Sequence, residues 1–162
     1  MKNILIPTDF TIRSLKLISA AVAHFDDEPL SIHLIHALEP DDSISGMLFM
    51  HKRLKVHSLY DDTYLQACEM LKNKYASIIQ KMNIAFYLGN TKYYRNSFLN
   101  ARQIDAIVLP ADYTFKKCSP SQSVDPMKLW KQNEVPVVQV SILEEKPVAA
   151  FSEQSMADLL FS

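Results

Sequence analysis

Short apolar runs alternate with segments of helical periodicity along this chain, and that alternation constrains its fold more than any other feature. Residues 3–7 form a nearly continuous apolar run, and Leu15, Ile18 and Val22 then follow at the spacing of one helix face. A second apolar run covers residues 30–38. Strands that are apolar at almost every position are typical of parallel sheets covered on both faces. The start of the chain is therefore predicted to form a strand, a helix and a parallel second strand.

The same pattern continues along the rest of the chain. It predicts a helix over residues 60–82, a strand over 84–88, a helix over 93–102, a strand over 104–109, a short helix over 127–132 and a fifth strand over 135–140. Five strands alternating with four helices indicate a doubly wound α/β domain with helices on both faces of a parallel sheet. Residues 1–141 are assigned to this domain and residues 142–162 to a C-terminal extension.

The C-terminal extension carries a small apolar cluster formed by Met156, Leu159, Leu160 and Phe161. Left exposed, such a cluster would make an adhesive patch. Two interpretations stay open, a turn that binds a partner and a segment that folds back on the domain.

Charge and hydropathy exclude several classes of function. Seventeen basic and 18 acidic residues give a formal charge of -1, so no net field favours a nucleic acid. No apolar run reaches the length of about 18 to 20 residues that a membrane span requires. Cys68 and Cys118 are too few and too far apart for a disulfide framework. We expect a cytoplasmic protein with two reduced thiols, and no binding to nucleic acid or membrane.

Glycine is scarce, which limits the phosphate-binding loops that the chain can form. Gly46 and Gly89 are the only 2 glycines in 162 residues, and they cannot assemble a dinucleotide fingerprint or a P-loop. In a doubly wound sheet, ligands bind at the carboxyl ends of the strands where the winding reverses. That rule points to the turns after the first strand, at Asp9, and after the fourth strand, between Pro110 and Asp112.

Three segments together resemble the universal stress protein family over residues 1–141. They are the opening run over residues 4–11, which reads ILIPTDFT, the strand over residues 107–109 and the closing run over residues 135–140. The resemblance implies a five-stranded parallel sheet of strand order 3-2-1-4-5, as in the adenine nucleotide α-hydrolase-like group. It also implies a homodimer formed through the last strand, from Val135 to Val140.

The nucleotide-binding branch of that family carries a motif of three glycines followed by Ser or Thr, just after the fourth strand. Counted from the strand end, the corresponding positions here are Pro110, Tyr113, Ser123 and Val124, so all three glycines are replaced. Proline removes an amide donor, and a tyrosine ring prevents the close approach of backbone to phosphate that glycine permits. The glycine motif is therefore absent.

Part of the family's cleft is nevertheless retained. The resemblance places Asp9 on the adenosine side, while from the residues alone a cap of the first helix is favoured over a ligand acceptor. His33 and His36 lie three apart in a strand, on opposite faces, so they do not predict a metal site. The candidate cleft residues are Pro7, Asp9, His36, Ala37, Pro110, Asp112 and Ser123.

The sequence predicts a homodimeric regulatory or interaction module with no cofactor. It assigns no catalytic residue and no Ser-His-Asp triad, so no enzyme activity is expected. The alternative is a sensor of a nucleotide or phosphometabolite, for which ATP or another adenine nucleotide would be the ligand. That alternative uses Asp9 and the segment from Lys116 to Ser123, whose lysines and serines could bind phosphate.

Overall fold

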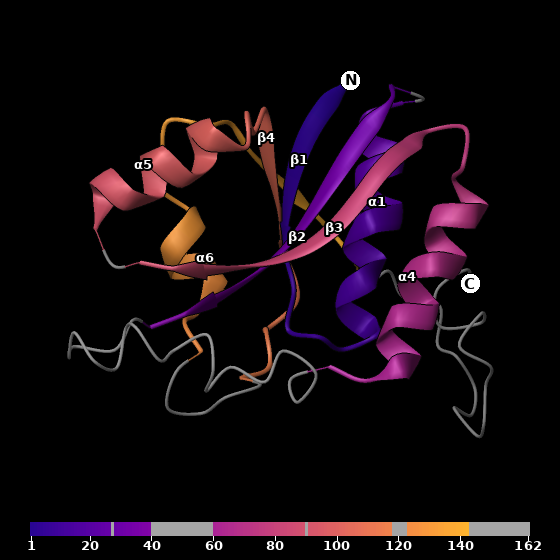
Figure 1. The fold of residues 1–162 in the computed structure, drawn as a ribbon, viewed down its shortest axis with the longest axis horizontal. Coiled ribbons are helices and arrows are strands. Elements are labelled where there is room, and N and C mark those ends of the chain that lie inside the picture. The colour runs from indigo at the N-terminus through magenta and orange to yellow at the C-terminus, as the bar shows by residue number, and fades with distance from the viewer. Residues whose placement is uncertain (27, 40–59, 90, 118–122, 143–162) are drawn as a thin grey trace.

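The computed structural model describes residues 1–26, 28–39, 60–89, 91–117 and 123–142. Its elements follow in the order β1 (Lys2–Pro7), the 3-10 turn η1 (Arg13–Leu15), α1 (Lys16–His24), β2 (Leu30–Leu38), α4 (Asp62–Lys74), β3 (Ile79–Leu88), α5 (Lys92–Ala101), β4 (Ala106–Pro110), α6 (Pro126–Trp130) and β5 (Val137–Val140). Strands and helices alternate as predicted (Figure 1). The predicted extension beyond residue 142, with its apolar cluster, and Cys118 lie outside the described residues.

The strands form one sheet in the order β3-β2-β1-β4-β5, which confirms the predicted order. Every neighbouring pair of strands is parallel. Strand β1 pairs with β2 on one side and with β4 on the other, so that Leu5 lies opposite both His33 and Ile107. The winding therefore reverses between β1 and β4, and their carboxyl ends meet at the lower edge of the sheet in Figure 1.

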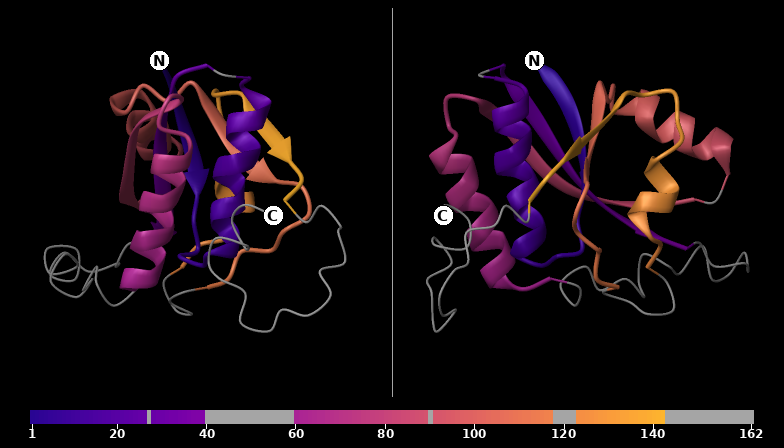
Figure 2. Two further views of the ribbon diagram at one scale, coloured as in Figure 1. Left: turned by 90° about the vertical axis from the view of Figure 1, so that its right-hand side faces the viewer. Right: turned by 180° about the vertical axis from the view of Figure 1, so that it is seen from behind.

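Two pairs of helices enclose the sheet. Helices α1 and α4 cover one face, and α5 and α6 cover the other, as the two views in Figure 2 show. Strand β1 divides its side chains accordingly: Ile4 and Ile6 belong to the first core, and Leu5 belongs to the second. Because both faces are covered, the strand is apolar at successive positions instead of alternating.

In three helices, the side chain of the residue before the first turn accepts a hydrogen bond from a backbone N–H. The Asp61 carboxylate accepts from Tyr64 N at 3.0 Å, and the Thr91 hydroxyl accepts from Tyr94 N at 3.1 Å. Helix α6 is capped in the same way: Asp125 accepts from Met127 N at 3.0 Å, and the residue after Asp125 is a proline. Such caps satisfy amides that the first helical turn leaves without intrahelical partners.

The predicted boundary between the long helix and the third strand is wrong. Helix α4 ends at Lys74, and β3 runs over ten residues from Ile79, whereas the sequence pattern extended the helix to Met82. After the helix, Ile79 N donates to Tyr75 O at 2.7 Å and closes a turn. Tyr75, Ile78 and Met82 keep a helical spacing across this turn although they do not share a helix. Polar residues such as Lys81 interrupt the apolar pattern of this edge strand, so the sequence does not mark where the strand begins.

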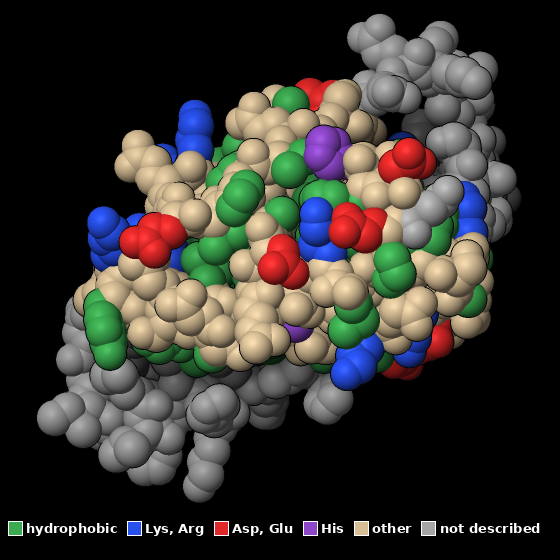
Figure 3. Space-filling view, turned by 90° about the horizontal axis from the view of Figure 1, so that it is seen from above, with side chains coloured by type: hydrophobic (Ala, Val, Ile, Leu, Met, Phe, Trp, Pro, Cys, Tyr) green, Lys and Arg blue, Asp and Glu red, His purple; other side chains and the backbone are tan. Residues whose placement is uncertain are grey.

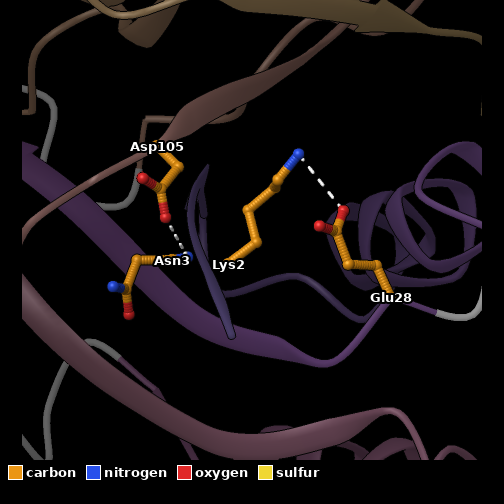
Figure 4. A network of polar contacts seen from close by, with 4 residues as sticks. All are labelled: Lys2, Asn3, Glu28 and Asp105. Atoms are coloured by element: carbon orange, nitrogen blue, oxygen red, sulfur yellow. Dashed lines mark hydrogen bonds and ion pairs between the residues drawn. The ribbon is translucent and has the colours of Figure 1, made fainter.

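The amino ends of the strands are joined by polar contacts, shown in Figure 4. Asn3 N donates to the Asp105 carboxylate at 2.8 Å, which ties β1 to the start of β4. Lys2 forms an ion pair with Glu28 at 3.2 Å. Seen from this side in Figure 3, basic and acidic side chains are interspersed and not gathered by sign. This face therefore offers no one-signed patch that would attract a polyanion.

No helix among the described residues is long and apolar enough to cross a bilayer. The other predicted elements match the observed ones within a few residues. Helix α5 is displaced by one residue from the predicted range, and β4 and β5 each begin two residues later than predicted. The strand order confirms the predicted switch point of the sheet, between β1 and β4.

Candidate functional site

Asp9 connects the loop that follows β1 to the segment that follows β4. Its carboxylate is buried, with only 2% of the residue exposed. Oδ1 accepts from Thr11 N at 3.1 Å and from Thr11 Oγ1 at 2.5 Å. Oδ2 accepts from the Tyr113 hydroxyl at 2.5 Å and from Lys116 N at 2.8 Å. Both carboxylate oxygens therefore bind groups of this chain itself.

The interpretation of Asp9 as a cap of the first helix is wrong. Neither η1 nor α1 has a side-chain cap at its N-terminus. The nearest equivalent is Thr11, whose Oγ1 accepts from Ser14 N at 3.2 Å. A buried carboxylate requires several donors, and those of Asp9 come from Thr11 in its own loop and from Tyr113 and Lys116 in the second loop, not from the helix.

Tyr113, which the resemblance aligns with a family glycine, binds Asp9 directly. Burial and the hydrogen bond to Asp9 raise the pKa of Tyr113 to about 12, so its hydroxyl remains a donor at neutral pH. The ring also meets Phe115 edge to face, with ring centroids 5.3 Å apart. The Tyr113 side chain is thus held between Asp9 and Phe115.

His36 connects the same loop to the second half of the site. Its Nδ1 lies 2.7 Å from the carbonyl oxygen of Thr8, and its Nε2 lies 3.0 Å from Ser123 Oγ. A carbonyl oxygen can only accept, so Nδ1 carries the proton and Nε2 of the neutral ring accepts from Ser123. Burial lowers the pKa of His36 below its ordinary value, against opposing contributions from the Thr8 carbonyl and from Asp9.

A group of aromatic rings forms the inner wall of this region. Phe10 lies in the left-handed region of the backbone, at φ 60°. Its ring packs against His36 at 4.8 Å, Tyr60 at 4.9 Å and Tyr64 at 5.5 Å between centroids. The hydroxyl of Tyr64 is hydrogen-bonded to Thr8 Oγ1 at 2.7 Å. The loop after β1 is therefore fixed on its inner side by packing and on its outer side by Asp9.

A small cavity of ≈ 150 Å³ lies between the two loops. It is lined by Thr8, Asp9, His36, Thr114, Phe115, Lys116, Lys117, Ser123, Val124, Asp125 and Pro126. A cavity of about this volume can hold a group the size of benzene. The site can therefore accept a small group, and its charged and hydroxyl side chains can orient one.

The structure brings some predicted cleft residues together and places others apart. Asp9, His36 and Ser123 line the cavity. Pro7 and Pro110 end β1 and β4, and the Ala37 side chain packs in the core on the opposite face of the sheet.

Asp112 turns away from the cavity. It accepts from Ser141 Oγ and from Ile142 N, and so ties the end of β4 to the segment after β5.

The two histidines of β2 lie on opposite faces of the sheet. His33 Nε2 lies 3.3 Å from Asn3 Oδ1 on one face, while His36 faces the cavity on the other. The described residues contain no group of three or more His, Cys, Asp or Glu that could hold a metal ion. Cys68 is buried on α4 as predicted, and burial raises the pKa of its thiol to about 12.

Thr11, Tyr113 and Lys116 are the site partners that sequence reasoning did not assign to Asp9. Tyr113 was marked only as an obstacle to phosphate, although a phenol near an acidic residue is also a donor. The backbone amide of Lys116 gives no signal in the sequence. The contact between His36 and Ser123 could have been suspected, because the ends of β2 and of the segment after β4 meet at one edge of the sheet.

No protein-family model matches the sequence, and no curated protein matches it either. Solved structures do match. A hypothetical protein, PH0823, is similar with a TM-score of 0.52 and 14% identity, covering 90% of this chain and 99% of that one. The hypothetical protein MJ0577 has a TM-score of 0.52 and 16% identity, with coverage of 86% and 95%.

Universal stress protein UspA from Lactobacillus plantarum gives a similar result. Its TM-score is 0.52 and its identity 16%, over 86% of this chain and 97% of that chain. Identities this low show a shared fold and nothing finer. The chain is accordingly a universal stress protein-like α/β domain, in agreement with the resemblance of its strand motifs.

Proposed function

We propose that this chain acts as a universal stress protein-like regulatory or interaction module that does not bind ATP through the family's glycine motif. The observation that carries the proposal is the hydrogen bond of 2.5 Å between the Tyr113 hydroxyl and Asp9 Oδ2. The resemblance assigns Asp9 to the adenosine side of the cleft, and here that carboxylate is bound by the chain's own loop. A nucleotide would have to displace Tyr113 and would find Pro110 and Val124 in place of phosphate-binding groups.

Titration calorimetry with ATP and Mg²⁺ tests this proposal. We expect no saturable heat tighter than about 1 mM, or about -4 kcal/mol, because the amides that would hold the phosphates are missing. Binding of one nucleotide per chain near 1 μM, about -8 kcal/mol, would contradict the proposal. The matched control is the Asp9→Ala variant. If this variant gives the same heat as the wild-type chain, that heat does not come from binding in the cleft.

A second candidate function is a phosphometabolite sensor, favoured by the presence of Lys116, Lys117 and Ser123 around the cavity. These side chains would bind a phosphate by charge and hydroxyl contacts in place of backbone amides. Binding of a small phosphate ester that is weakened both by Asp9→Ala and by the double change of both lysines to alanine would favour this candidate. Binding that is indifferent to both variants would remove its basis.

We also propose that two copies pair through the last strand. Strand β5 (Val137–Val140) lies at the edge of the sheet, with β4 as its neighbour. An edge strand presents backbone donors and acceptors that a second chain can pair with. Three of its four residues are partly buried, so the strand offers apolar side chains next to that edge.

Light scattering of the eluted peak tests the homodimer. We expect twice the mass of the 18.5 kDa chain, unchanged over a hundredfold dilution from about 100 μM, as for an interface of standard size with a Kd well below 1 μM. A monomer that stays a monomer at the highest concentration would contradict this part of the proposal. The result is independent of the ATP titration.

A further inference from the structure

Ser123 and His36 have the geometry of a nucleophile and its base. Ser123 Oγ lies 3.0 Å from His36 Nε2, within the range over which a base accepts a hydroxyl proton. The second ring nitrogen, Nδ1, donates to the Thr8 carbonyl oxygen at 2.7 Å. That hydrogen bond fixes both the orientation of the ring and its tautomer, so Nε2 presents its lone pair to the serine.

The surroundings of His36 keep it neutral and able to accept a proton. The ring is buried at 3% exposure, and burial lowers its pKa. Asp9 favours the cation, so a proton taken up at Nε2 is stabilised, and Asp125 is a second acidic residue in the lining of the cavity. Lys116 and Lys117 line the same cavity from the segment after β4, and the rings of Phe10 and Phe86 pack against the imidazole.

Backbone pairing holds Ser123 at the cavity. It forms an antiparallel bridge with Leu38, and the next residue, Val124, donates its amide to Ala37 O at 3.0 Å. The serine is thus placed by the end of β2, the same strand that carries His36. Nucleophile, base and the carbonyl that orients the base are therefore all positioned by the edge of one sheet.

We propose that Ser123 is a reactive serine that accepts a short acyl group from an activated ester or thioester. Ser123 Oγ attacks the carbonyl carbon and forms an ester bond, while its proton passes to His36 Nε2. The bond between the carbonyl carbon and the leaving oxygen or sulfur breaks, and His36 returns the proton to that leaving group. The reaction transfers one acyl group to the chain and needs no oxidant, metal or nucleotide.

The size and lining of the cavity select this class of donor. Its volume of ≈ 150 Å³ suits a short acyl group. Phe115, Val124 and Pro126 give it apolar surface for the acyl carbon atoms. The two lysines favour the negative charge that develops on the carbonyl oxygen during attack. The proposal goes beyond the proposed function and does not depend on whether ATP binds.

The test uses the full chain and p-nitrophenyl acetate. We expect one acetyl group per chain by intact mass, with one equivalent of nitrophenolate released, and peptide mapping should place the acetyl group on Ser123. The labelling rate should rise with pH through the pKa of His36, with a midpoint below the ordinary value of 6.5, and then level off. Mapping the wild-type label identifies its position even where a variant folds poorly.

Three variants sharpen the result. Ser123→Ala should abolish labelling, and Ser97→Ala, an exposed serine on α5, should leave it unchanged. His36→Asn can keep the hydrogen bond to Thr8 but has no basic nitrogen, so its rate should fall by about 100-fold or more. Acetyl groups on the lysines instead of Ser123, no labelling, or a rate that keeps rising with pH without levelling off would each overturn the proposal.

Discussion

Replacing Trp130 with alanine is expected to lower the free energy of unfolding by about 3 to 5 kcal/mol, the usual cost of removing a buried tryptophan. The residue is fully buried at 0% exposure on α6. Its ring meets Tyr87 at 5.0 Å and Phe98 at 6.2 Å between centroids, so its removal leaves a void between α5, α6 and the sheet. Urea denaturation followed by far-ultraviolet circular dichroism measures the loss, because the variant contains no tryptophan for fluorescence.

Two comparison variants separate this effect from a general sensitivity to losing an aromatic ring. Trp130→Phe retains part of the packing and should cost no more than about half as much. Tyr93→Ala removes a ring that is 82% exposed and should change the stability by less than about 0.5 kcal/mol. Equal losses for Trp130→Ala and Tyr93→Ala would contradict the second core as described.

Replacing Asp9 with alanine is expected to cost about 2 to 4 kcal/mol, because hydrogen bonds to a buried charge are strong and their loss leaves donors without acceptors. The amide of Lys116 and the hydroxyl of Tyr113 would both lose the carboxylate that they bind at 2.8 Å and 2.5 Å. The same urea titration measures the change. Asp9→Asn retains one carbonyl acceptor and should cost less than the alanine change.

A double-mutant cycle isolates the contact between the two loops. Tyr113→Phe removes only the hydroxyl, and its effect should be smaller in the Asp9→Ala background, where the contact of the hydroxyl with Thr11 Oγ1 at 3.1 Å remains. A coupling of about 1 kcal/mol or more is expected for a hydrogen-bonded pair. Additive losses would mean that other contacts hold the loop after β4, and that the hydrogen bond between Tyr113 and Asp9 does not.

The sequence pattern predicted the topology of the sheet correctly, but it predicted the ends of the helices and strands less accurately. Central strands such as β1 and β2 are apolar at nearly every position, so their bounds were predicted within one residue. Strand β3 lies at an edge, and its polar positions Gln80, Lys81 and Asn83 broke the pattern on which the prediction relied. The helix before it was therefore extended too far. An edge strand is shaped by pairing with its one neighbour, which local periodicity does not report.

The meeting of the two loops was predicted, but the contacts between them were not. The reversal of winding located Asp9 and the segment after β4 from topology alone. The contacts of Asp9 could not be predicted in full, because two of its donors come from residues more than 100 positions away and one of these is a backbone amide. The tautomer of His36 likewise depends on a carbonyl oxygen of the loop, which no residue type indicates.

The left-handed residues of this chain have a consequence for its unfolded state. Among the described residues, φ is positive at Phe10, Asp26 and Gln103, and none of them is glycine. Gly89 does not have positive φ, and the ring of Tyr94 fills the space that a Cβ would need there. Glycine turns are entropically costly to order, whereas a side chain forced into the left-handed region costs about 1 to 3 kcal/mol of strain.

A chain with 2 glycines in 162 residues therefore has a narrower unfolded ensemble than usual. Phe10 has a strained backbone because it carries a Cβ atom, and four neighbouring aromatic side chains hold its ring in place. A glycine at this position would relieve the backbone but would widen the unfolded ensemble and remove that anchor. The packing of the Phe10 side chain, and not a conformational preference of the backbone, therefore determines the shape of the loop after β1.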